Sequence, residues 1–512
     1  MTTSATEPGF AETLRSTIPA RIDRLPWSSF HTRLVLALGV AWILDGLEIS
    51  VASSVEGALT KSDTLNMSAA GSTTIATVYL VGQVLGALVF GLFADKWGRR
   101  KLFMITLGVY LVGSGLSAAT AGAGSGWVLF LYATRFIAGT GIGGEYAAIN
   151  SAIDELIPAR FRGRVDIAVN GTYWAGAMIG TFATFLFLTT IPASVGWRLG
   201  FLLGPVLGLV IIYVRRNLPE SPRWLIMHGK PEEAEAAIAG IEAEVRAGGG
   251  ELSEVGEDQA LEIQPADRTG YFALLRVLLR DYFPRSVLGL GLMVTQSFLY
   301  NAIFFSYSIV LTVFYHVNGS AALYGIAFAV GNLIGPFVLG PLFDTVGRKR
   351  MISGSYLIAG VLLTVSAFLF KAQVFNAVTQ TAAWVIIFFF ASAGASAAYL
   401  TVSEIFPQEV RAKAIAVFFS IAQVVGALAT QFYGFLIDKN HPDFNKLFIG
   451  YITGAVIMIV GGLIAVFFGV AAEGRSLESV ARPLGVVKSA AQKVTGLGGG
   501  GDSPAGGVVA GE

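Results

Sequence analysis

The sequence predicts an all-α membrane protein with twelve transmembrane helices in two pseudo-symmetric six-helix bundles. Hydrophobic residues make up 54% of the 512 residues and charged residues only 13%, whereas soluble globular proteins carry about 25% charge. Twelve apolar windows are long enough, at roughly 20 residues each, to cross about 30 Å of hydrocarbon. A charged turn at 91–101, between two of these windows, returns at 340–350, as an internal repeat would.

The apolar windows fall into two sets of six. The first set lies near 34–56, 69–94, 102–122, 127–150, 165–189 and 196–215, and the second near 284–315, 321–343, 351–371, 380–403, 412–437 and 446–470. We therefore expect an N-terminal segment (1–33), a first bundle (34–216), a linker with short helices (217–282), a second bundle (283–471) and a mostly disordered tail (472–512). The end of the tail is rich in glycine and poor in apolar residues, so it cannot form a core.

The repeat relates the two sets of helices residue by residue. Asp95 aligns with Asp344 and Gly98 with Gly347, at an offset of 249 (340 minus 91). A second motif has the same offset: Glu155-x-x-Pro158-x-x-x-Arg162-x-Arg164 returns as Glu404-x-x-Pro407-x-x-x-Arg411-x-Lys413. Two motifs that share one offset indicate that the chain consists of two related halves.

The basic residues predict the orientation in the membrane. Of the 35 Lys and Arg residues, 29 lie in segments that share one side with the N-terminus. Because basic residues are retained on the cytoplasmic side, we expect a multi-pass protein of the cytoplasmic membrane with both termini in the cytoplasm.

The composition also excludes several functions. The net charge of +1 argues against a nucleic-acid partner, because nucleic-acid binders concentrate basic residues. The chain has no Cys, and its four His residues are scattered, so no metal site, cofactor or nucleophile–base pair is expected and an enzyme is a poor interpretation.

Several motifs together resemble one known family. Besides the paired turns, Pro-Glu-Ser-Pro-Arg-Trp-Leu at 219–225, Ser-Glu-Ile-Phe-Pro at 403–407 and Glu-Gly-Arg-Ser-Leu-Glu at 473–478 are similar to the sugar porter family of the major facilitator superfamily. The resemblance covers roughly residues 34–480. It implies the major facilitator fold, in which a carrier works by alternating access with a site between two six-helix bundles.

The charged residues at the cytoplasmic helix ends are candidates for a gate. Carboxylate–guanidinium pairs there can hold one face closed, and the resemblance implies such a gate. The candidates are Asp95, Arg99, Arg100, Glu155, Arg162, Glu220, Arg223, Asp344, Arg348, Glu404 and Arg411. The alternative is that these residues only set the topology and cap helices.

Two acids in the first apolar window are candidates for proton coupling. Asp45 and Glu48 are three residues apart and share one helix face, where a charge costs several kcal/mol unless it is paired or hydrated. The resemblance places Glu48 and Arg135 where proton-coupled sugar porters have an Asp–Arg pair. The alternatives are a permanent ion pair, or a role for Asp45 as the titrating or substrate-binding group.

Glu145 departs from the sugar porter pattern. It follows a glycine-rich run, 139–144, whose small residues are spaced for close helix contact. A Gly-Gly-Glu sequence there looks more like the related metabolite–proton symporters of organic or aromatic acids. Glu145 is therefore a candidate either for the cytoplasmic charge network or for proton transfer.

Amides and aromatic residues in the apolar windows are candidates for substrate binding, because they can hydrogen-bond hydroxyls and stack on rings. The positions that match the family pattern are Asn170, Trp174, Gln296, Asn301, Asn332, Tyr399 and Gln423. Several differ from the sugar porter residues, among them Tyr399, which stands where the family has Trp. For any single amide, an interhelical packing bond is an alternative.

We therefore expect a secondary active transporter that moves a small polar metabolite, with a sugar or polyol favoured, by proton symport. The alternatives are a symporter of organic or aromatic acids, a uniporter and a non-transporting membrane sensor. The expected partners are a small-molecule substrate, protons and the lipid bilayer, with no nucleic acid, and the protein is expected to be monomeric.

Overall fold

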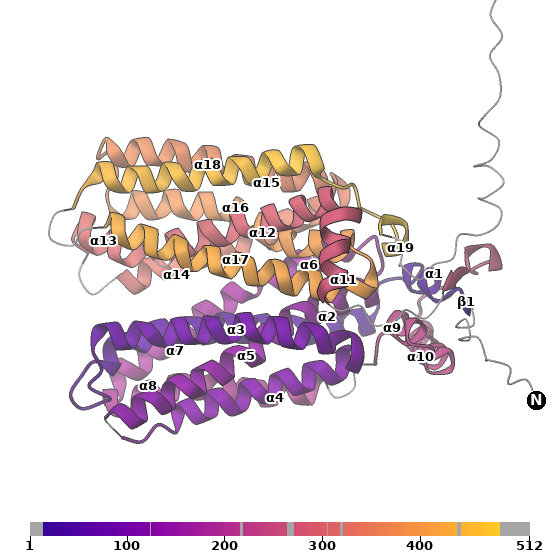
Figure 1. The fold of residues 1–512 in the computed structure, drawn as a ribbon, viewed down its shortest axis with the longest axis horizontal. Coiled ribbons are helices and arrows are strands. Elements are labelled where there is room, and N and C mark those ends of the chain that lie inside the picture. The colour runs from indigo at the N-terminus through magenta and orange to yellow at the C-terminus, as the bar shows by residue number, and fades with distance from the viewer. Residues whose placement is uncertain are drawn as a thin grey trace, which may run out of the picture.

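The structure is a computed structural model that describes residues 14–122, 124–215, 219–263, 271–304, 306–317, 321–437 and 442–481. The side chain of Asp95, one of the gate candidates, lies outside the described part, as does the tail from 482 onward. Long helices dominate, and they form two groups that lie against each other along their length (Figure 1).

The first group contains the helices of the N-terminal half. These are α2 (Ser29–Leu59), α3 (Ala69–Trp97), α4 (Arg99–Ala118), α5 (Ser125–Leu156), α6 (Arg162–Gly171), α7 (Tyr173–Thr190) and α8 (Ala193–Arg215). The second group contains α12 (Phe283–Phe304), α13 (Tyr307–Tyr315), α14 (Ala321–Thr345), α15 (Arg348–Lys371), α16 (Ala377–Ile405), α17 (Gln408–Leu436) and α18 (Phe444–Phe468).

The number of membrane-spanning helices agrees with the prediction. Within the described residues, eleven helical segments are long and apolar enough to cross a membrane, with α6 and α7 forming one span and α12 and α13 another. The twelfth is α5, whose 32 residues are long enough to cross but include Arg135 and several glycines, which lower its hydropathy. The prediction of an all-α membrane fold with twelve spans is confirmed.

The two groups meet along a few helices. α3 packs against α17, and α6 and α7 pack against α14. Because the offset of 249 relates α3 to α14 and the α6–α7 span to α17, these two interfaces are equivalent under the internal repeat. The pseudo-symmetry inferred from the sequence is thus present in the packing.

Glycines allow α3 and α5 to lie unusually close together. A Cβ added to Gly139 would overlap the backbone carbonyl of Tyr79, and one added to Gly143 would overlap that of Gln83. The glycine-rich run on α5 therefore makes the close helix contact that its spacing predicts.

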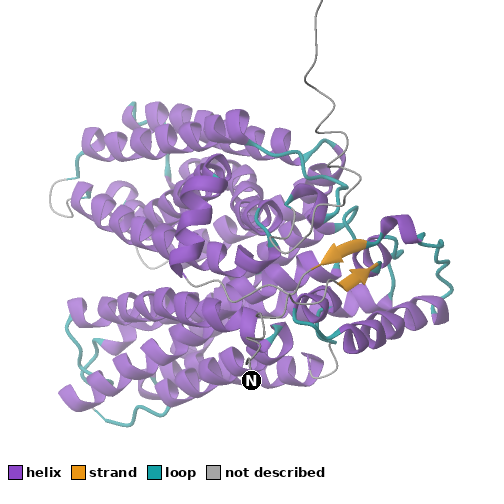
Figure 2. Ribbon diagram, turned by 45° about the vertical axis from the view of Figure 1, so that its right-hand side comes forward, coloured by secondary structure: helices purple, strands orange, loops and turns teal. Residues whose placement is uncertain are grey.

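Short elements gather at one end of the long helices, which we call the linker end (Figures 1 and 2). They are α1 (Ile18–Asp23), α9 (Pro222–Met227), α10 (Pro231–Ala247), η1 (Glu257–Gln259), α11 (Tyr271–Arg276), the π-helix η2 (Val277–Asp281) and α19 (Leu477–Val480). Strand β1 (Leu14–Ser16) pairs antiparallel with β2 (Leu261–Ile263). This small sheet was not predicted.

The N-terminal strap, which consists of β1 and α1 with Arg24, is fixed to the linker by charged groups. Arg21 pairs with Glu242 on α10 at 2.9 Å, and Arg24 pairs with the same carboxylate at 2.5 Å. Burial favours the neutral form of Glu242, but the hydrogen bonds from Arg21 and Arg24 outweigh it and lower the pKa of this carboxyl. The strap and α10 therefore form one unit at the linker end.

Candidate functional site

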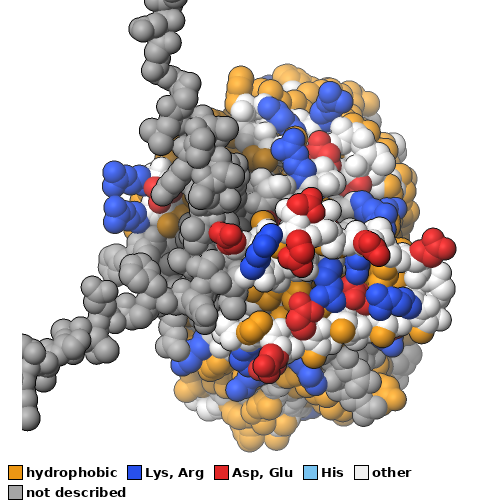
Figure 3. Space-filling view, turned by 90° about the vertical axis from the view of Figure 1, so that its right-hand side faces the viewer, with side chains coloured by type: hydrophobic (Ala, Val, Ile, Leu, Met, Phe, Trp, Pro, Cys, Tyr) orange, Lys and Arg blue, Asp and Glu red, His pale blue; other side chains and the backbone are white. Residues whose placement is uncertain are grey.

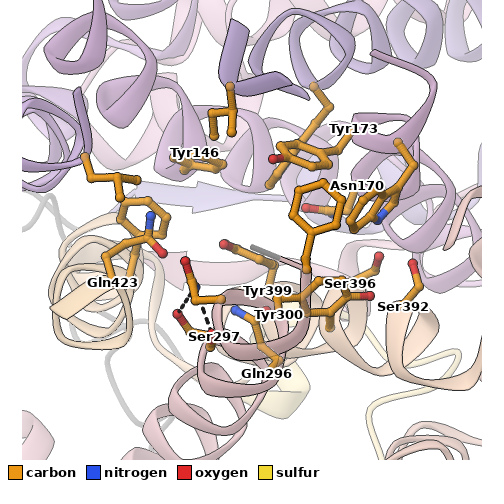
Figure 4. Close-up of a pocket in the computed structure, with 18 residues that line it drawn as sticks. Tyr146, Asn170, Tyr173, Gln296, Ser297, Tyr300, Ser392, Ser396, Tyr399 and Gln423 are labelled. Atoms are coloured by element: carbon orange, nitrogen blue, oxygen red, sulfur yellow. Dashed lines mark hydrogen bonds between the residues drawn. The ribbon is translucent and has the colours of Figure 1, made fainter. Parts of the chain in front are cut away.

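A cavity of about 140 Å³ lies between the two groups of helices (Figure 4). Its lining comes from α2, α3, α5, α6 and α7 on one side and from α12, α16 and α17 on the other. The lining residues are Trp42, Ile49, Leu80, Tyr146, Asn170, Tyr173, Trp174, Gln296, Ser297, Tyr300, Asn301, Phe304, Ser392, Ala395, Ser396, Tyr399, Phe419 and Gln423. This described lining contains no Lys, Arg, His, Asp or Glu.

Aromatic rings form much of the cavity wall. The rings of Trp174 and Phe304 lie 5.0 Å apart edge to face, and those of Tyr146 and Phe419 lie 4.5 Å apart. Tyr399 stacks near Tyr146 from the other half, at 6.1 Å. Such faces can hold a flat ring or the C–H face of a sugar.

Six of the seven predicted substrate residues line this cavity. These are Asn170, Trp174, Gln296, Asn301, Tyr399 and Gln423, and their role in binding stays a prediction. Figure 4 shows the Gln296 amide directed toward the space between the halves.

Asn332 was predicted together with the substrate-binding residues, but it does not line the cavity. It is fully buried, and its Oδ1 accepts a hydrogen bond of 2.8 Å from the hydroxyl of Tyr300. Tyr300 itself lines the cavity. Asn332 therefore orients a wall residue from behind and does not face the space itself.

Several lining residues were missed as binding candidates. Trp42 and Tyr146 lie on helices for which only charged residues were predicted to be functional. Ser392 lies in a run of small residues. Trp42 shares a face with Asp45, three residues on, and this spacing is the signal that could have placed it near the site.

Glu48 and Arg135 form a fully buried ion pair. The carboxylate also accepts hydrogen bonds from Ser114 Oγ at 2.8 Å and from the Tyr110 hydroxyl at 3.0 Å. The Arg135 guanidinium lies between two aromatic rings, 4.7 Å from the centre of Tyr79. The fold therefore brings together the pair that was proposed from the sequence. Neutral hydroxyl groups also donate hydrogen bonds to its carboxylate.

Asp45 lies one helical turn from Glu48 but has different partners. Its Oδ1 accepts from Gln83 Nε2 at 3.1 Å and from the Tyr79 hydroxyl at 3.3 Å, and its Oδ2 accepts from the Tyr146 hydroxyl. All three donors are neutral, and Tyr146 lines the cavity. Asp45 thus connects the cavity wall with Tyr79, the ring that stacks on Arg135.

Glu145 is buried on α5 next to Tyr146 and is not among the residues that line the cavity. Its proposed roles, in the charge network or in proton transfer, both remain predictions.

At the linker end, the gate candidates form matching pairs in the two halves. Arg99 Nη2 lies 2.8 Å from Glu155, and the equivalent Arg348 Nε lies 3.0 Å from Glu404. All four side chains are buried. The two pairs are related by the offset of 249 that the sequence motifs show.

Two acids outside the repeated motifs cap the helices that begin at Arg99 and Arg348. Glu220 accepts the backbone N–H of Arg99 at 2.8 Å and that of Arg100 at 3.2 Å, while Glu473 accepts the N–H of Arg348 at 3.2 Å. Burial raises the pKa of Glu220, although these N–H groups partly oppose the effect. Figure 3 shows acidic and basic side chains gathered on this face.

Several contacts between described residues cross from one half to the other at the linker end. Arg162 Nη1 lies 3.7 Å from Glu404. The backbone N–H groups of Gly163 and Arg164 donate to Asp344 at 3.0 and 2.9 Å. The linker end is therefore closed by an interhalf latch that consists of Arg162, Gly163, Arg164, Asp344 and Glu404.

Two further gate candidates, Arg223 and Arg411, are also buried at the linker end. Arg223 lies 3.2 Å from Asp23 of the strap and 3.1 Å from Glu478 of α19. Arg411 is buried and donates to the backbone carbonyl of Phe406 at 3.3 Å. Asp23 and Glu478 were not among the residues predicted for the gate.

Comparison with known proteins identifies the family. The model of the family described as "Sugar (and other) transporter" matches residues 41–484. The chain belongs to this family. The match includes all of the spans except the start of α2, so the sugar porter resemblance of the sequence motifs is confirmed.

Several relatives of this chain are named as transporters. The niacin transporter NiaP of Acinetobacter baylyi is 30% identical over 223 residues, which are 44% of this chain and 48% of that protein. The match therefore spans about half the length of that relative. YdjK of Escherichia coli, named a metabolite transport protein, is 28% identical over 476 residues, 90% of this chain and 96% of the relative.

Solved structures of the same fold include the proton:xylose symporter XylE. Its structure bound to 6-bromo-6-deoxy-D-glucose has a TM-score of 0.72 and 20% sequence identity, and covers 88% of this chain and 98% of XylE. Its inward-open structure from Escherichia coli has a TM-score of 0.60. This likeness shows the major facilitator fold.

Proposed function

We propose that this sugar transporter family chain is a proton-coupled secondary transporter that moves a small polar metabolite by alternating access. The observation that carries the proposal is the buried Glu48–Arg135 pair beside a polar and aromatic cavity between the halves. A proton-coupled transporter needs both a titratable group and a central site, and here the two are connected by side-chain contacts.

Protonation of Glu48 would couple the proton gradient to movement. A proton on the carboxylate removes its attraction for Arg135. The guanidinium contacts the ring of Tyr79, whose hydroxyl donates to Asp45, and Asp45 accepts from Tyr146 in the cavity wall. A change at the ion pair is thereby passed to the substrate site through three contacts.

The latch at the linker end supports alternating access. Its interhalf contacts are polar, and two of them use backbone N–H groups. Polar contacts of this kind can separate and reform, because water replaces them when they open.

The cavity favours a small substrate that carries a ring and polar groups. Gln296, Asn301 and Gln423 provide amides, and Trp174 provides a stacking face. A sugar or polyol fits this combination.

A second candidate is an aromatic or heteroaromatic acid. The aromatic wall formed by Trp174, Phe304 and Tyr146 favours a flat ring, and one relative is named a niacin transporter. The described lining has no cationic side chain, so such a substrate would bind through amide and hydroxyl donors and would bind best when its carboxyl is neutral.

We further propose that the linker end faces the cytoplasm and that the protein acts as a monomer in the cytoplasmic membrane. The basic residues concentrate on the linker side, as the positive-inside rule requires. The sides of the bundles expose apolar residues such as Phe435 (86%), Phe467 (74%) and Leu129 (68%), which suits contact with lipid.

Uptake into proteoliposomes would test this function. The purified full-length protein, with an imposed inward proton gradient, should concentrate one member of a panel of hexoses, polyols and nicotinate- or benzoate-like acids. An uncoupler should abolish the accumulation. Flux that does not depend on the gradient would instead indicate a uniporter, and binding without flux would indicate a sensor.

A further inference from the structure

A second buried carboxyl lies between the cavity and the linker end. Asp166 is on α6, one turn before Asn170, and its side chain is fully buried. Asn170 lines the cavity, while Arg162 and Gly163, at the start of the same short helix, belong to the interhalf latch. One helix of ten residues therefore links the site to the latch, with Asp166 in between.

The carboxyl of Asp166 is only partly satisfied. Its Oδ1 accepts from Asn170 Nδ2, and the same amide donates to Asn150 Oδ1 at 3.3 Å. Its Oδ2 has no hydrogen-bond partner among the described residues. Glu48, by contrast, has a guanidinium and two hydroxyl donors.

Among the described residues, the two cations near Asp166 also face other carboxylates. The charged groups around Asp166 are the carboxylates of Asp154 on α5 and Glu404 on α16, and the guanidiniums of Arg348 on α15 and Arg162 on α6. Arg348 is engaged by Glu404 through two hydrogen bonds of 3.0 and 3.1 Å. Arg162 lies within 4 Å of Asp154 (3.9 Å) and Glu404 (3.7 Å).

The position of Asp166 makes its charged form costly. A buried carboxylate without its own cation costs several kcal/mol, and such a group is neutralised by a proton more readily than it stays charged. Neighbouring carboxylates add to this cost. The uncapped oxygen Oδ2 is the atom that has room for a proton.

We propose that Asp166 is a second proton-binding carboxyl, which takes its proton from the cavity beside Asn170 and releases it at the linker end when the latch opens. This inference rests on the proposed proton-coupled transport. Asp166 takes up one proton from cavity water on Oδ2, while Oδ1 keeps its hydrogen bond from the Asn170 amide. The same proton passes to water on the linker side.

The geometry couples this release to the latch. Movement of α6 away from α14 and α16 would separate Arg162 from Glu404 and Gly163 from Asp344, and it would admit water to Asp166. Each substrate would then be accompanied by two protons, one on Glu48 and one on Asp166. Asp166 is not among the residues that line the cavity, and so it differs from the predicted binding residues.

The stoichiometry of transport tests the proposal. In proteoliposomes, the reversal potential of substrate flux gives the number of protons per substrate. The variant Asp166→Asn should lower this number by one and flatten the pH dependence of efflux, while Asp63→Asn, in an exposed turn, should match the wild type. An unchanged stoichiometry and pH profile in Asp166→Asn would overturn the proposal.

Infrared spectroscopy of the purified protein gives a readout that does not need transport. The wild type should show the carbonyl stretch of a protonated buried carboxyl, and this band should be lost in Asp166→Asn or, if that variant does not fold, in Asp166→Ser. A spectrum in which these variants keep every such band would overturn the assignment. If the wild type shows no proton-driven flux, the proposed function fails, whereas the infrared band still decides whether Asp166 holds a proton.

Discussion

The backbone N–H of Gly163 donates to the carboxylate of Asp344 at 3.0 Å, and this hydrogen bond joins the two halves of the molecule at the linker end. The site has no room for a side chain. A Cβ on Gly163 would overlap both the Asp344 carboxylate and the Arg348 guanidinium. An alanine there would have to displace the ends of these two side chains, so the observed closed state favours glycine at this position.

The first prediction is that Gly163→Ala shifts the protein toward an open linker end. Overpacking of this kind costs about 1–3 kcal/mol, which corresponds to a change of roughly 5- to 150-fold in the ratio of closed to open states. The chain has no Cys, so a single cysteine at Ser396 in the cavity wall can report access. Its rate of modification by a thiol reagent added on the linker side should rise.

Gly354 provides the matched control for this substitution. It lies inside α15, and a Cβ there meets nothing within 4 Å. Gly354→Ala should leave the labelling of the cysteine unchanged. Equal labelling of the two alanine variants would show that the Gly163 contact does not hold the latch closed.

The internal repeat explains why the residues of the two buried ion pairs at the linker end could be predicted from sequence, while their role as a gate stays a prediction. Arg99, Glu155, Arg348 and Glu404 stand in two motifs with one offset, and equivalent positions in a duplicated fold form equivalent pairs. The acids Asp23 and Glu478 come from segments outside the repeat. Their contact with Arg223 depends on how the termini fold back, and local sequence patterns carry no such information.

The site was predicted less completely for a related reason. Asn332 matches the family pattern, yet in the structure it lies behind Tyr300 and binds its hydroxyl. Sequence spacing predicts which residues share a face of a helix, but not which other helices that face contacts. Asp166 is four residues from Asn170, which places it on the same face. Its burial depends on α14 and α16 from the other half.

The strands β1 and β2, with three residues each, are too short to show a periodic pattern.

The second prediction concerns Asn332 as a positioning residue. Asn332→Ala should weaken substrate binding by removing the acceptor that orients the Tyr300 hydroxyl, an effect of about 1–3 kcal/mol if the hydroxyl stays buried without a partner. Tyr300→Phe should cause a loss of similar size. Substrate affinity of the two single variants and the double variant, measured by counterflow, gives a double-mutant cycle.

The outcome of the cycle separates two roles for Asn332. If it acts through Tyr300, the double variant should bind about as well as Tyr300→Phe alone. Losses that simply add would show that Asn332 contributes to binding independently of Tyr300.

The third prediction is that acid releases the N-terminal strap from α10. The pKa of Glu242 is lower in the folded protein than in the unfolded chain, because Arg21 and Arg24 bind its charged form. Its stabilising contribution is therefore complete above the unfolded pKa of about 4.3 and is lost as the pH falls through the lower folded value.

Hydrogen exchange of residues 14–24 would measure this release. In the wild type, protection should decrease as the pH falls through the acidic range. In Glu242→Gln, protection should already be low at neutral pH and should not decrease further in acid. The exposed pair Lys230–Glu233 offers the control Glu233→Gln, which should behave as the wild type. Protection in Glu242→Gln equal to that of the wild type would exclude Glu242 as the residue that holds the strap.

The fourth prediction separates coupling from transport at Glu48. In Glu48→Gln the side chain keeps its shape and can still bond Ser114 and Tyr110, but it can neither hold nor release a proton. Accumulation of substrate driven by a pH gradient should fall to what the single proton on Asp166 can drive, while exchange of labelled for unlabelled substrate across proteoliposomes should continue at close to the wild-type rate. Arg135→Ala should be more damaging, because it leaves a buried carboxylate without its cation, at a cost of about 3–5 kcal/mol. If Glu48→Gln accumulates as much substrate as the wild type, Glu48 does not hold a coupling proton, and Asp45, which accepts from Tyr146 in the cavity wall, becomes the residue to replace next.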